Sequence, residues 1–193
     1  MVRAILDGTK TQTRRVNKDM SCYSEAFCYD FYKGTYGITE YESDGNPRYQ
    51  VEIPLAYCPG DILWVRETFT LTQYGKSVYK ADCRDKDGYY WSSVAADING
   101  VKWRPSIHMP RKTARIFLEV KSVRVERLQD ITEDDAKKEG FISKRAWIPG
   151  VGFPELNPRD WFTVLWDFLN AKRGYSWESN PWVWVIEFAR VKK

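Results

Sequence analysis

The clearest hydrophobic pattern in the chain is a long alternation over residues 114–127. Ile116, Leu118 and Val120 fall on one face of an extended strand, and the residues between them fall on the other. The alternation changes phase at residues 121–122 and then continues with valines. A shift of one residue inside a long strand is what a β-bulge produces, and bulges bend strands at the corners of barrels. The pattern therefore predicts a long, bent β-strand.

Two shorter patterns predict further strands. Trp184, Ile186 and Phe188 alternate along residues 182–191, which predicts a final strand. Residues 62–67 follow a Pro-Gly-Asp turn and form an apolar run of strand length that ends in charge. Both segments are therefore expected to join the long strand in one sheet.

Three segments carry helix signals. Residues 2–7 form a short apolar run that ends at Gly8, a residue type that adopts the positive φ of a helix end. Thr132 begins a second helix as an N-cap before three acidic residues, and Gly140 ends it. Asn157, followed by proline, begins a third helix. The apolar stripe expected for the third helix consists of Trp161, Leu165, Phe168 and Leu169.

The order of these elements predicts an α+β fold in one domain over residues 1–193. Strands outnumber helices and the bent strand favours closure, so we expect a small β-barrel decorated by helices. Residues 17–57 and 68–100 are expected to be loop-rich insertions. The first has room for a hairpin, and the second contains short strand-like pieces such as 77–79. Residues 103–111 are rich in proline and predict an ordered loop.

Composition adds further constraints. The 193 residues carry a formal net charge of +4, which is less basic than is usual for proteins that coat duplex DNA. Aromatic residues make up 16% of the chain; such side chains build cores and also stack on nucleobases, and composition alone favours the core. We expect no membrane partner, because no apolar run has the length of a membrane-spanning or secretory segment.

Cysteine and histidine usage argues against a metal site. The four cysteines show no CxxC spacing, and His108 is the only histidine, so we expect no Cys/His zinc site and no other metal or cofactor. The cysteines are then most simply reduced thiols, which predicts a cytoplasmic protein.

The strongest candidate chemistry lies directly after Gly8. Lys10 and Thr13 are three residues apart, and a hydroxyl near an amine can support nucleophilic chemistry. Arg14 and Arg15 follow, and guanidinium groups hold anions or bases. Two simpler interpretations remain open. The lysine and the arginines form a basic loop that holds phosphate, or Thr13 is a helix cap or turn residue.

Recognition of a base needs aromatic faces and polar groups that read base edges. Five residues at strand ends or in the ordered loop are candidates for this role: Trp64, Arg66, Glu67, Trp103 and Arg104. Trp64 lies within a hydrophobic run, so a core position is the simpler interpretation for it. Trp103 is flanked by Lys102 and Arg104 and is the better stacking candidate.

Taken together, these segments resemble the ASCH domain family, and the wider chain looks like its phage- and prophage-associated members. The family's signature of a glycine, a lysine, a polar residue and an arginine is matched by Gly8, Lys10, Thr13 and Arg15. Further segments support the likeness in the same order along the chain: residues 59–67, 103–111, 128–133 and 180–184. The resemblance implies a small β-barrel related to the PUA domain, with a ligand cleft beside the barrel.

The resemblance also implies binding of RNA, single-stranded DNA or a modified nucleobase. One branch of the family hydrolyses the amide of N4-acetylcytidine with a lysine, a threonine and a glutamate, and these roles fall on Lys10, Thr13 and Glu139. Many ASCH sequences carry glutamate at the Thr13 position, so the threonine points to a metal-independent amidohydrolase. Arg14, Arg15 and the five candidates above would then bind the substrate.

Other functions remain open beside this hydrolase. Glu139 follows Lys137 and Lys138 at the end of a short helix, and on spacing alone it is a solvated surface charge. A non-catalytic module for RNA or single-stranded DNA fits the same residues. So does an ASCH-type ribonuclease in which the 2′-hydroxyl of RNA is the nucleophile. The oligomeric state is left open.

Overall fold

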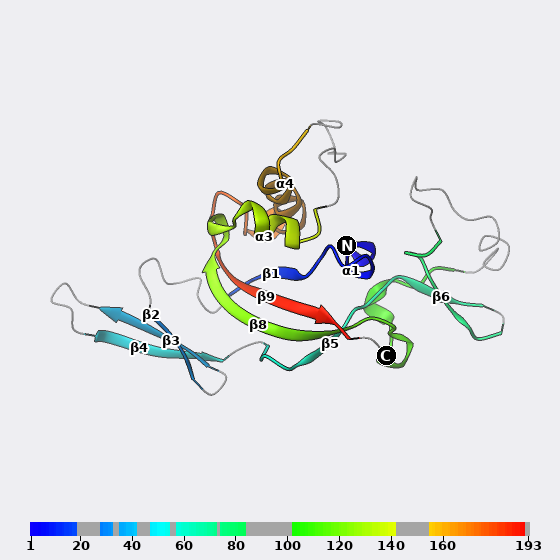
Figure 1. Ribbon diagram of the computed structural model, residues 1–193, viewed down its shortest axis with the longest axis horizontal. Helices are drawn as coiled ribbons and strands as arrows, with labels where there is room; N and C mark the ends of the chain where they lie inside the picture. The colour runs from blue at the N-terminus through cyan, green and yellow to red at the C-terminus, as the bar shows by residue number, and fades with distance from the viewer. Residues whose placement is uncertain are drawn as a thin grey trace.

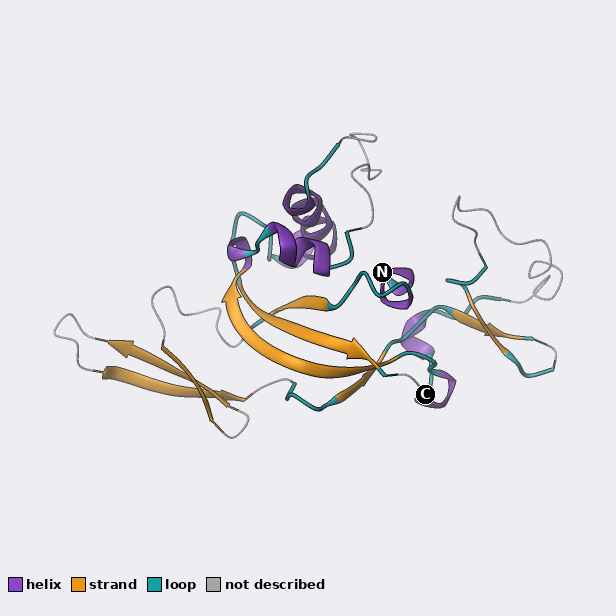
Figure 2. Cartoon of the chain, in the orientation of Figure 1, coloured by secondary structure: helices purple, strands orange, loops and turns teal. Residues whose placement is uncertain are grey.

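A curved, four-stranded antiparallel sheet forms the centre of the protein, whose structure is a computed structural model (Figure 1). Its strands lie in the order β1 (Gln12–Val16), β9 (Trp182–Arg190), β8 (Phe117–Arg127) and β5 (Ile62–Trp64). The sheet curls into a half-barrel with β1 and β5 at its two edges (Figure 2). The structure describes residues 1–18, 28–32, 35–41, 47–54, 57–72, 74–83, 102–141 and 155–191, with only the backbone described between 28 and 54.

Strand β8 carries the predicted bulge. Val120 pairs with Phe188 and Ser122 pairs with Glu187, so one extra residue of β8 lies between two consecutive partners on β9. The prediction of a long, bent strand is confirmed. The bend curls the sheet, because a bulge increases the local twist of the strand that contains it.

Strand β9 is buried on both faces. Trp184 and Ile186 pack with valines of β8 in one apolar cluster. Val183 and Val185 point to the opposite face and pack beneath the helices. The prediction that Trp184 and Ile186 share one buried face of β9 is therefore confirmed. The other face is buried as well, because β9 lies between β1 and β8 and is covered by helices.

The three predicted helices are present. Helix α1 (Val2–Leu6) ends before Gly8, which has a φ of 76°. Helix α3 (Glu133–Lys138) begins with Thr132, whose side chain accepts a hydrogen bond from the main-chain N–H of Asp135. Helix α4 (Pro158–Asn170) begins with Asn157, whose side chain accepts from the N–H of Asp160. These caps satisfy N–H groups that have no partner inside the helix.

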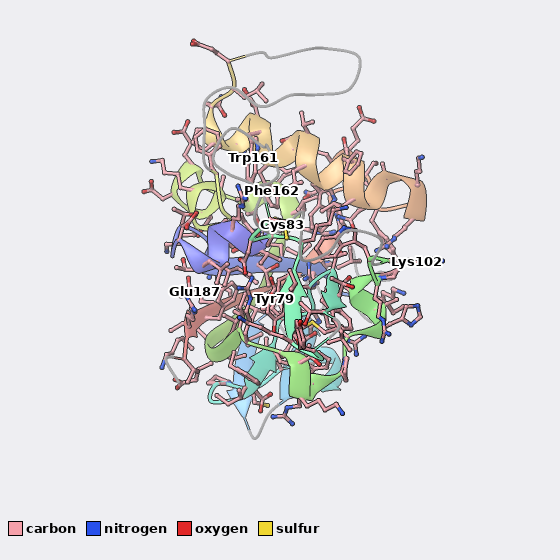
Figure 3. All side chains as sticks on the ribbon, turned by 90° about the vertical axis from the view of Figure 1, so that its right-hand side faces the viewer. Tyr79, Cys83, Lys102, Trp161, Phe162 and Glu187 are labelled. Carbon is pink, nitrogen blue, oxygen red and sulfur yellow. The ribbon has the colours of Figure 1, made fainter. Side chains whose placement is uncertain are left out.

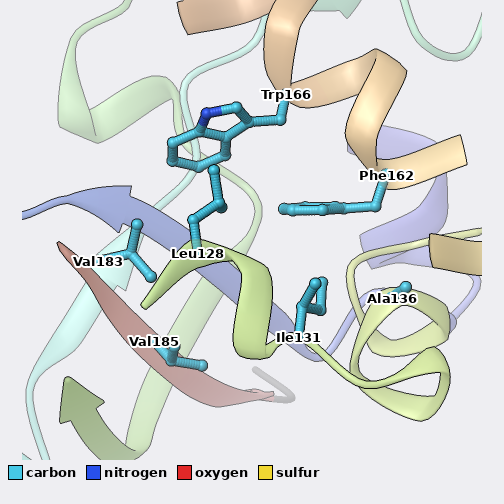
Figure 4. Close-up of a cluster of buried hydrophobic side chains, with 7 residues drawn as sticks. All are labelled: Leu128, Ile131, Ala136, Phe162, Trp166, Val183 and Val185. Carbon is cyan, nitrogen blue, oxygen red and sulfur yellow. The ribbon is translucent and has the colours of Figure 1, made fainter. Parts of the chain in front are cut away.

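The buried face of α4 differs from the predicted stripe. Figure 4 shows Phe162 and Trp166 pointing from α4 toward Leu128 and the two valines of β9. Phe168 is 73% exposed and Leu169 is 46% exposed, so the prediction that they face the core is wrong. The helix is apolar over a wide arc, and its partner, the surface formed by β9 and α3, selects which part of that arc is buried.

Smaller elements fill the predicted insertions. A separate three-stranded antiparallel sheet, in the order β2-β3-β4, lies within residues 17–57 and consists of β2 (Cys28–Tyr32), β3 (Thr35–Tyr41) and β4 (Pro47–Pro54). The second insertion contains a two-stranded pair of β6 (Phe69–Leu71) and β7 (Ser77–Tyr79). Strand β5 is shorter than the predicted run over 62–67. Within the described ranges, no helix has the length and apolarity needed to cross a membrane.

The loop predicted over 103–111 is ordered by two short 3-10 turns, Ser106–His108 and Arg111–Thr113. Two further turns of this kind, Leu128–Asp130 and Ala171–Arg173, follow β8 and α4. Buried Met109 packs in a cluster with Phe69 and so fixes the loop over residues 103–111. The loop therefore has a fixed backbone without regular secondary structure.

Candidate functional site

The segment between α1 and β1 runs beside the end of α3. The N–H of Lys10 donates to the carbonyl oxygen of Ala4 at 2.9 Å, and the N–H of Thr11 donates to that of Lys138 at 2.9 Å. Lys10 and Glu139 form an isolated antiparallel bridge. The backbone itself thus brings the glycine–lysine motif of the N-terminus against the C-terminal end of α3.

Lys10 and Glu139 form a buried ion pair. The Lys10 Nζ lies 2.6 Å from Glu139 Oε2 and donates a second hydrogen bond, at 2.8 Å, to the main-chain oxygen of Glu139. The two side chains are only 4% and 3% exposed. Glu139 is therefore not the solvated surface charge that its neighbours in sequence favoured. A buried lysine is costly unless it is paired, and this pairing satisfies both charges.

The surroundings of Lys10 lower its pKa. Burial is the main cause, because it disfavours the charged form of an amine. The Glu139 carboxylate opposes this effect, and the positive charges of Arg15 and Arg14 add to it. The result is an amine whose pKa lies below the ordinary value of 10.5. Such an amine gives up its proton more readily than a surface lysine does.

Arg14 lies beneath the pair, with a fully buried side chain. Its guanidinium contacts Glu126, lies 3.4 Å from Asp135 and lies 3.4 Å from Glu139 Oε1. It also lies over the ring of Phe162, 5.7 Å from its centroid. Arg14 was predicted to bind substrate, but its hydrogen bonds go to carboxylates of this protein. Its position is that of a residue that holds Glu139 in place.

Thr13 and Arg15 face the other side of β1. They pair with Ile186 and Trp184 in the antiparallel register, and directly opposed residues point to the same face of a sheet. Together with Lys10 they line a cavity of about 560 Å³. The rest of its lining comes mainly from α1 and β5 and includes Trp64 and Arg66. The cavity therefore lies between the two edge strands of the half-barrel.

A second cavity, of about 630 Å³, lies below α4. It shares Met1, Thr13 and Arg15 with the first cavity, so the two adjoin at these residues. Glu139 lines the second cavity, whereas Lys10 lines the first. Thr13 thus lines both cavities, of which Lys10 lines one and Glu139 lines the other.

Three of the predicted base-binding residues make contacts within the fold. Trp64 packs at the edge of the apolar cluster around Phe69, and the Arg66 guanidinium lies 4.9 Å from its ring centroid. Glu67 is 2% exposed, and Arg115 donates to both of its carboxylate oxygens at 2.9 and 2.8 Å. Glu67 is therefore enclosed by a salt bridge, away from the cavity that Lys10 lines.

Trp103 and Arg104 are not brought to the Lys10 cavity. They line a different one, of about 530 Å³, together with Lys102 and His108. Lys102 lies at the edge of the molecule in the view of Figure 3. The predicted set of base-binding residues is thus divided between two separate places.

Sequence reasoning missed the carboxylates that surround Arg14. Glu126 comes from β8 and Asp135 from α3, and both also pair with Arg124. The only signal for Glu126 is the alternation of charged residues with valines at the end of β8, which predicts a polar face but no partner. Asp135 lies in the first turn of α3, where acidic residues are common in any helix, so no sequence signal pointed to its contact with Arg14.

Comparisons with family models, curated proteins and solved structures found no match to this chain. Across the described ranges, no three His, Cys, Asp or Glu side chains form a group that could hold a metal ion. The amine of Lys10 and the carboxyl group of Glu139 are in direct contact, and Thr13 lines both of the adjoining cavities.

Proposed function

We propose that this chain is a nucleobase-binding protein of the ASCH type, with a PUA-like barrel, and that it hydrolyses the amide of an N4-acylated cytosine such as N4-acetylcytidine. One observation carries the proposal: a buried lysine with a lowered pKa contacts a buried carboxylate, and a threonine lines the same ligand-sized cavity as the lysine. Cavities of a few hundred to about 1,000 Å³ are typical of small-molecule sites.

The chemistry begins with one proton transfer. Moving a proton from Lys10 Nζ to Glu139 Oε2, across 2.6 Å, leaves a neutral amine and a neutral carboxylic acid. The amine then accepts the hydroxyl proton of Thr13 as the Thr13 oxygen attacks the acyl carbon. Glu139 donates its proton to the departing amino group of cytosine, which leaves an acyl ester on Thr13. Water hydrolyses that ester, which restores the Thr13 hydroxyl, and the released acid loses its proton to solvent.

A shorter route uses the same residues without the ester. The neutral amine of Lys10 accepts a proton from a water molecule, and that water attacks the acyl carbon directly. Glu139 again protonates the departing amino group. Thr13 then contacts the substrate and does not bond to it. The two routes differ in one property, which is whether the Thr13 oxygen is essential.

The cavity walls supply groups that suit a base. The Arg15 guanidinium and the stacked pair of Trp64 and Arg66 line the same cavity as Lys10. A guanidinium donates to the carbonyl oxygen and ring nitrogen of a cytosine edge, and its plane stacks on a base. Apolar residues of α1 and β5 complete the wall, which favours a flat, uncharged ligand over a free phosphate.

The test is incubation with N4-acetylcytidine, with cytidine release followed by chromatography. Thr13→Val keeps the size and strand preference of the residue and removes the hydroxyl, whereas Thr13→Ser keeps the hydroxyl. We expect turnover by the wild type and by Thr13→Ser, and a loss of about a hundredfold or more in Thr13→Val if the ester route holds. Near-normal turnover in Thr13→Val selects the direct water route.

A folded wild-type protein that releases no cytidine would overturn the hydrolase proposal. Binding of cytidine and N4-acetylcytidine, measured by quenching of tryptophan fluorescence, then decides whether the chain is a non-catalytic base-binding module. Incubation with end-labelled RNA tests the ribonuclease alternative. Cleavage that persists in the presence of a chelator and disappears in Lys10→Met would favour it.

A further inference from the structure

The loop over residues 102–112 is a cationic surface that the proposed hydrolase site does not use. It contains five basic side chains and no acidic residue: Lys102, Arg104, His108, Arg111 and Lys112. All five side chains are exposed. We call this segment the basic loop.

The basic loop differs from those basic positions of the fold that are held in ion pairs. Arg14, Arg115 and Arg124 are each held by two or more carboxylates. Even the exposed Lys121 and Lys137 have acidic partners at 2.7 Å. By contrast, no described residue forms an ion pair with any of the five basic side chains of the basic loop, four of which are lysines or arginines. Positive charges gathered on one loop, without an acidic partner among the described residues, create a local positive potential.

The backbone of the basic loop is held in place. Arg104 bridges to Phe69 through two main-chain hydrogen bonds, of 2.8 and 3.2 Å. Met109 is buried at 3% exposure in the cluster below the loop. Pro105 and Pro110 precede the two 3-10 turns and restrict the backbone there. The cations are therefore presented by a preformed scaffold, which lowers the entropic cost of binding.

Two recesses flank the cations. A recess of about 530 Å³ is lined by Lys102, Trp103 and Arg104, and one of about 540 Å³ is lined by Lys112 and Thr113. Arg104 and His108 line both, so the recesses adjoin. Alternating cationic groups and hollows suit a strand whose phosphates and unstacked bases contact the protein in turn. The bases of a duplex are not free to enter such hollows.

The basic loop lies next to the Lys10 cavity. Arg66 lines that cavity, and its guanidinium donates to the main-chain oxygen of Ile107 at 3.3 Å. Ile107 belongs to the turn between Arg104 and Lys112 and is itself 68% exposed. A nucleic-acid strand on the basic loop is therefore separated from the Lys10 cavity by one side chain, that of Arg66.

We propose that the basic loop binds the backbone phosphates of a single-stranded nucleic acid and receives its bases in the two recesses. The part of this inference that concerns catalysis rests on the proposed function. There, the modified cytosine enters the Lys10 cavity as part of a polynucleotide, and the flanking nucleotides lie on the basic loop.

Binding is tested with fluorescein-labelled oligo(U) by fluorescence anisotropy. Arg104→Glu/Lys112→Glu reverses two charges of the basic loop. Lys121→Glu/Lys137→Glu is the matched control, because it reverses two exposed charges outside the loop and changes the net charge equally. We expect the loop variant to bind about tenfold more weakly and the control to bind like the wild type. Loss of two phosphate contacts should also make the salt dependence of log K shallower by about 1.4.

Three results would overturn the binding proposal. They are equal weakening in the two variants, absence of oligo(U) binding by the folded wild type at low salt, and displacement of oligo(U) by polyglutamate of equal charge. The last result would indicate an acidic protein partner. Retention of the wild-type melting temperature by the loop variant is the control for folding.

A second arm separates this inference from the hydrolase proposal. Turnover is compared for N4-acetylcytidine as the free nucleoside and within a short oligonucleotide. We expect the loop variant to keep the wild-type rate on the nucleoside and to lose about tenfold in kcat/KM on the oligonucleotide. Equal rates on the oligonucleotide would overturn the catalytic part. A wild type that hydrolyses neither substrate removes the hydrolase proposal, and the anisotropy result still decides the role of the basic loop.

Discussion

Lys10 donates hydrogen bonds to both the side-chain and the main-chain oxygen of Glu139, a residue 129 positions away in the chain. These bonds use two of the three hydrogens of the ammonium group. The third has no partner among the described residues, and Lys10 lines the cavity that Thr13 also lines. Both the stability of the fold and the proposed chemistry depend on this relationship, so it is the natural target for mutation.

We predict strong coupling between Lys10 and Glu139 in a double-mutant cycle. Lys10→Met leaves a buried carboxylate with only Arg14 nearby, which should cost about 3 kcal/mol in the free energy of unfolding. Glu139→Gln should cost less, because the lowered pKa of Lys10 lets the amine become neutral more easily. The double variant should lose less than the sum of the two, since no charge remains unpaired.

Urea unfolding at neutral pH measures these differences. Lys121→Met is the control, because Lys121 is 51% exposed and its contact with Glu119 is a surface ion pair. That variant should change stability by less than about 0.5 kcal/mol. Additive losses in the cycle would contradict the coupling.

The pH dependence of turnover should report Lys10. In the proposed steps the Lys10–Glu139 pair carries one proton, which Lys10 passes to Glu139 and Glu139 donates to the leaving group, so kcat/KM should fall as pH rises through the Lys10 pKa and that proton is lost. We call this fall the alkaline limb. Burial lowers that pKa, and the limb should therefore lie below the ordinary value of 10.5. Arg15 also lowers it, so Arg15→Gln should raise the Lys10 pKa and move the limb to higher pH.

A pH–rate profile on N4-acetylcytidine measures this shift. Arg173→Gln is the matched control, because Arg173 lines the adjoining cavity but does not contribute to the Lys10 pKa. An alkaline limb that stays in place in Arg15→Gln, with only the rate reduced, would mean that Lys10 is not the titrating group.

Replacement of Gly140 should destabilise the protein more than replacement of Gly174. Both glycines have positive φ, 98° and 85°, so alanine is strained at either position. A Cβ at Gly140 would also lie 3.1 Å from the Cβ atoms of Ala4 and Lys10, whereas a Cβ at Gly174 would meet no atom within 4 Å. We expect losses of about 1–2 kcal/mol for Gly174→Ala and about 2–4 kcal/mol for Gly140→Ala.

Thermal or urea unfolding of the two variants gives the comparison directly. Gly140→Ala should in addition reduce turnover, because the new methyl group pushes on Lys10. Equal losses of stability would show that only the backbone strain matters and that the contact between α3 and the Lys10 segment is loose.

Asp135 should contribute stability that acid removes. Burial by itself would raise its pKa, but the Arg14 charge, hydrogen bonds from Thr132 and the Arg124 charge lower the pKa below 3.8. A carboxyl group with a lowered pKa stabilises the folded state above its unfolded pKa, and the effect is lost as pH falls through the folded pKa. Asp135→Asn should therefore be destabilised at neutral pH, and its difference from the wild type should shrink in acid.

Stability measured by urea unfolding across the acidic range tests this sign. Asp134→Asn is the control on the same helix, because Asp134 is 83% exposed and its partner is the exposed Lys137. A difference between the wild type and Asp135→Asn that stays constant with pH would show that the carboxylate has no special partner in the folded state.

Several features of the fold could be predicted because their signals are local. The caps at Thr132 and Asn157 depend on residues only three positions apart. The bulge in β8 appears as a break in an alternation over a few residues. The buried face of α4 could not be predicted in this way, because Trp166 and Phe168 are both apolar and only the surface beneath the helix distinguishes them.

For the candidate site, the sequence by itself determined which groups are available: the lysine, the hydroxyl and the arginines after Gly8, and the carboxyl group at the end of α3. Only the tertiary structure decided their partners. It buries Arg14 among carboxylates, encloses Glu67 with Arg115, and separates Trp103 from the Lys10 cavity. The physical reason is that the cost of burying a charge depends on what surrounds it, and those surroundings come from strands and helices far away in the chain.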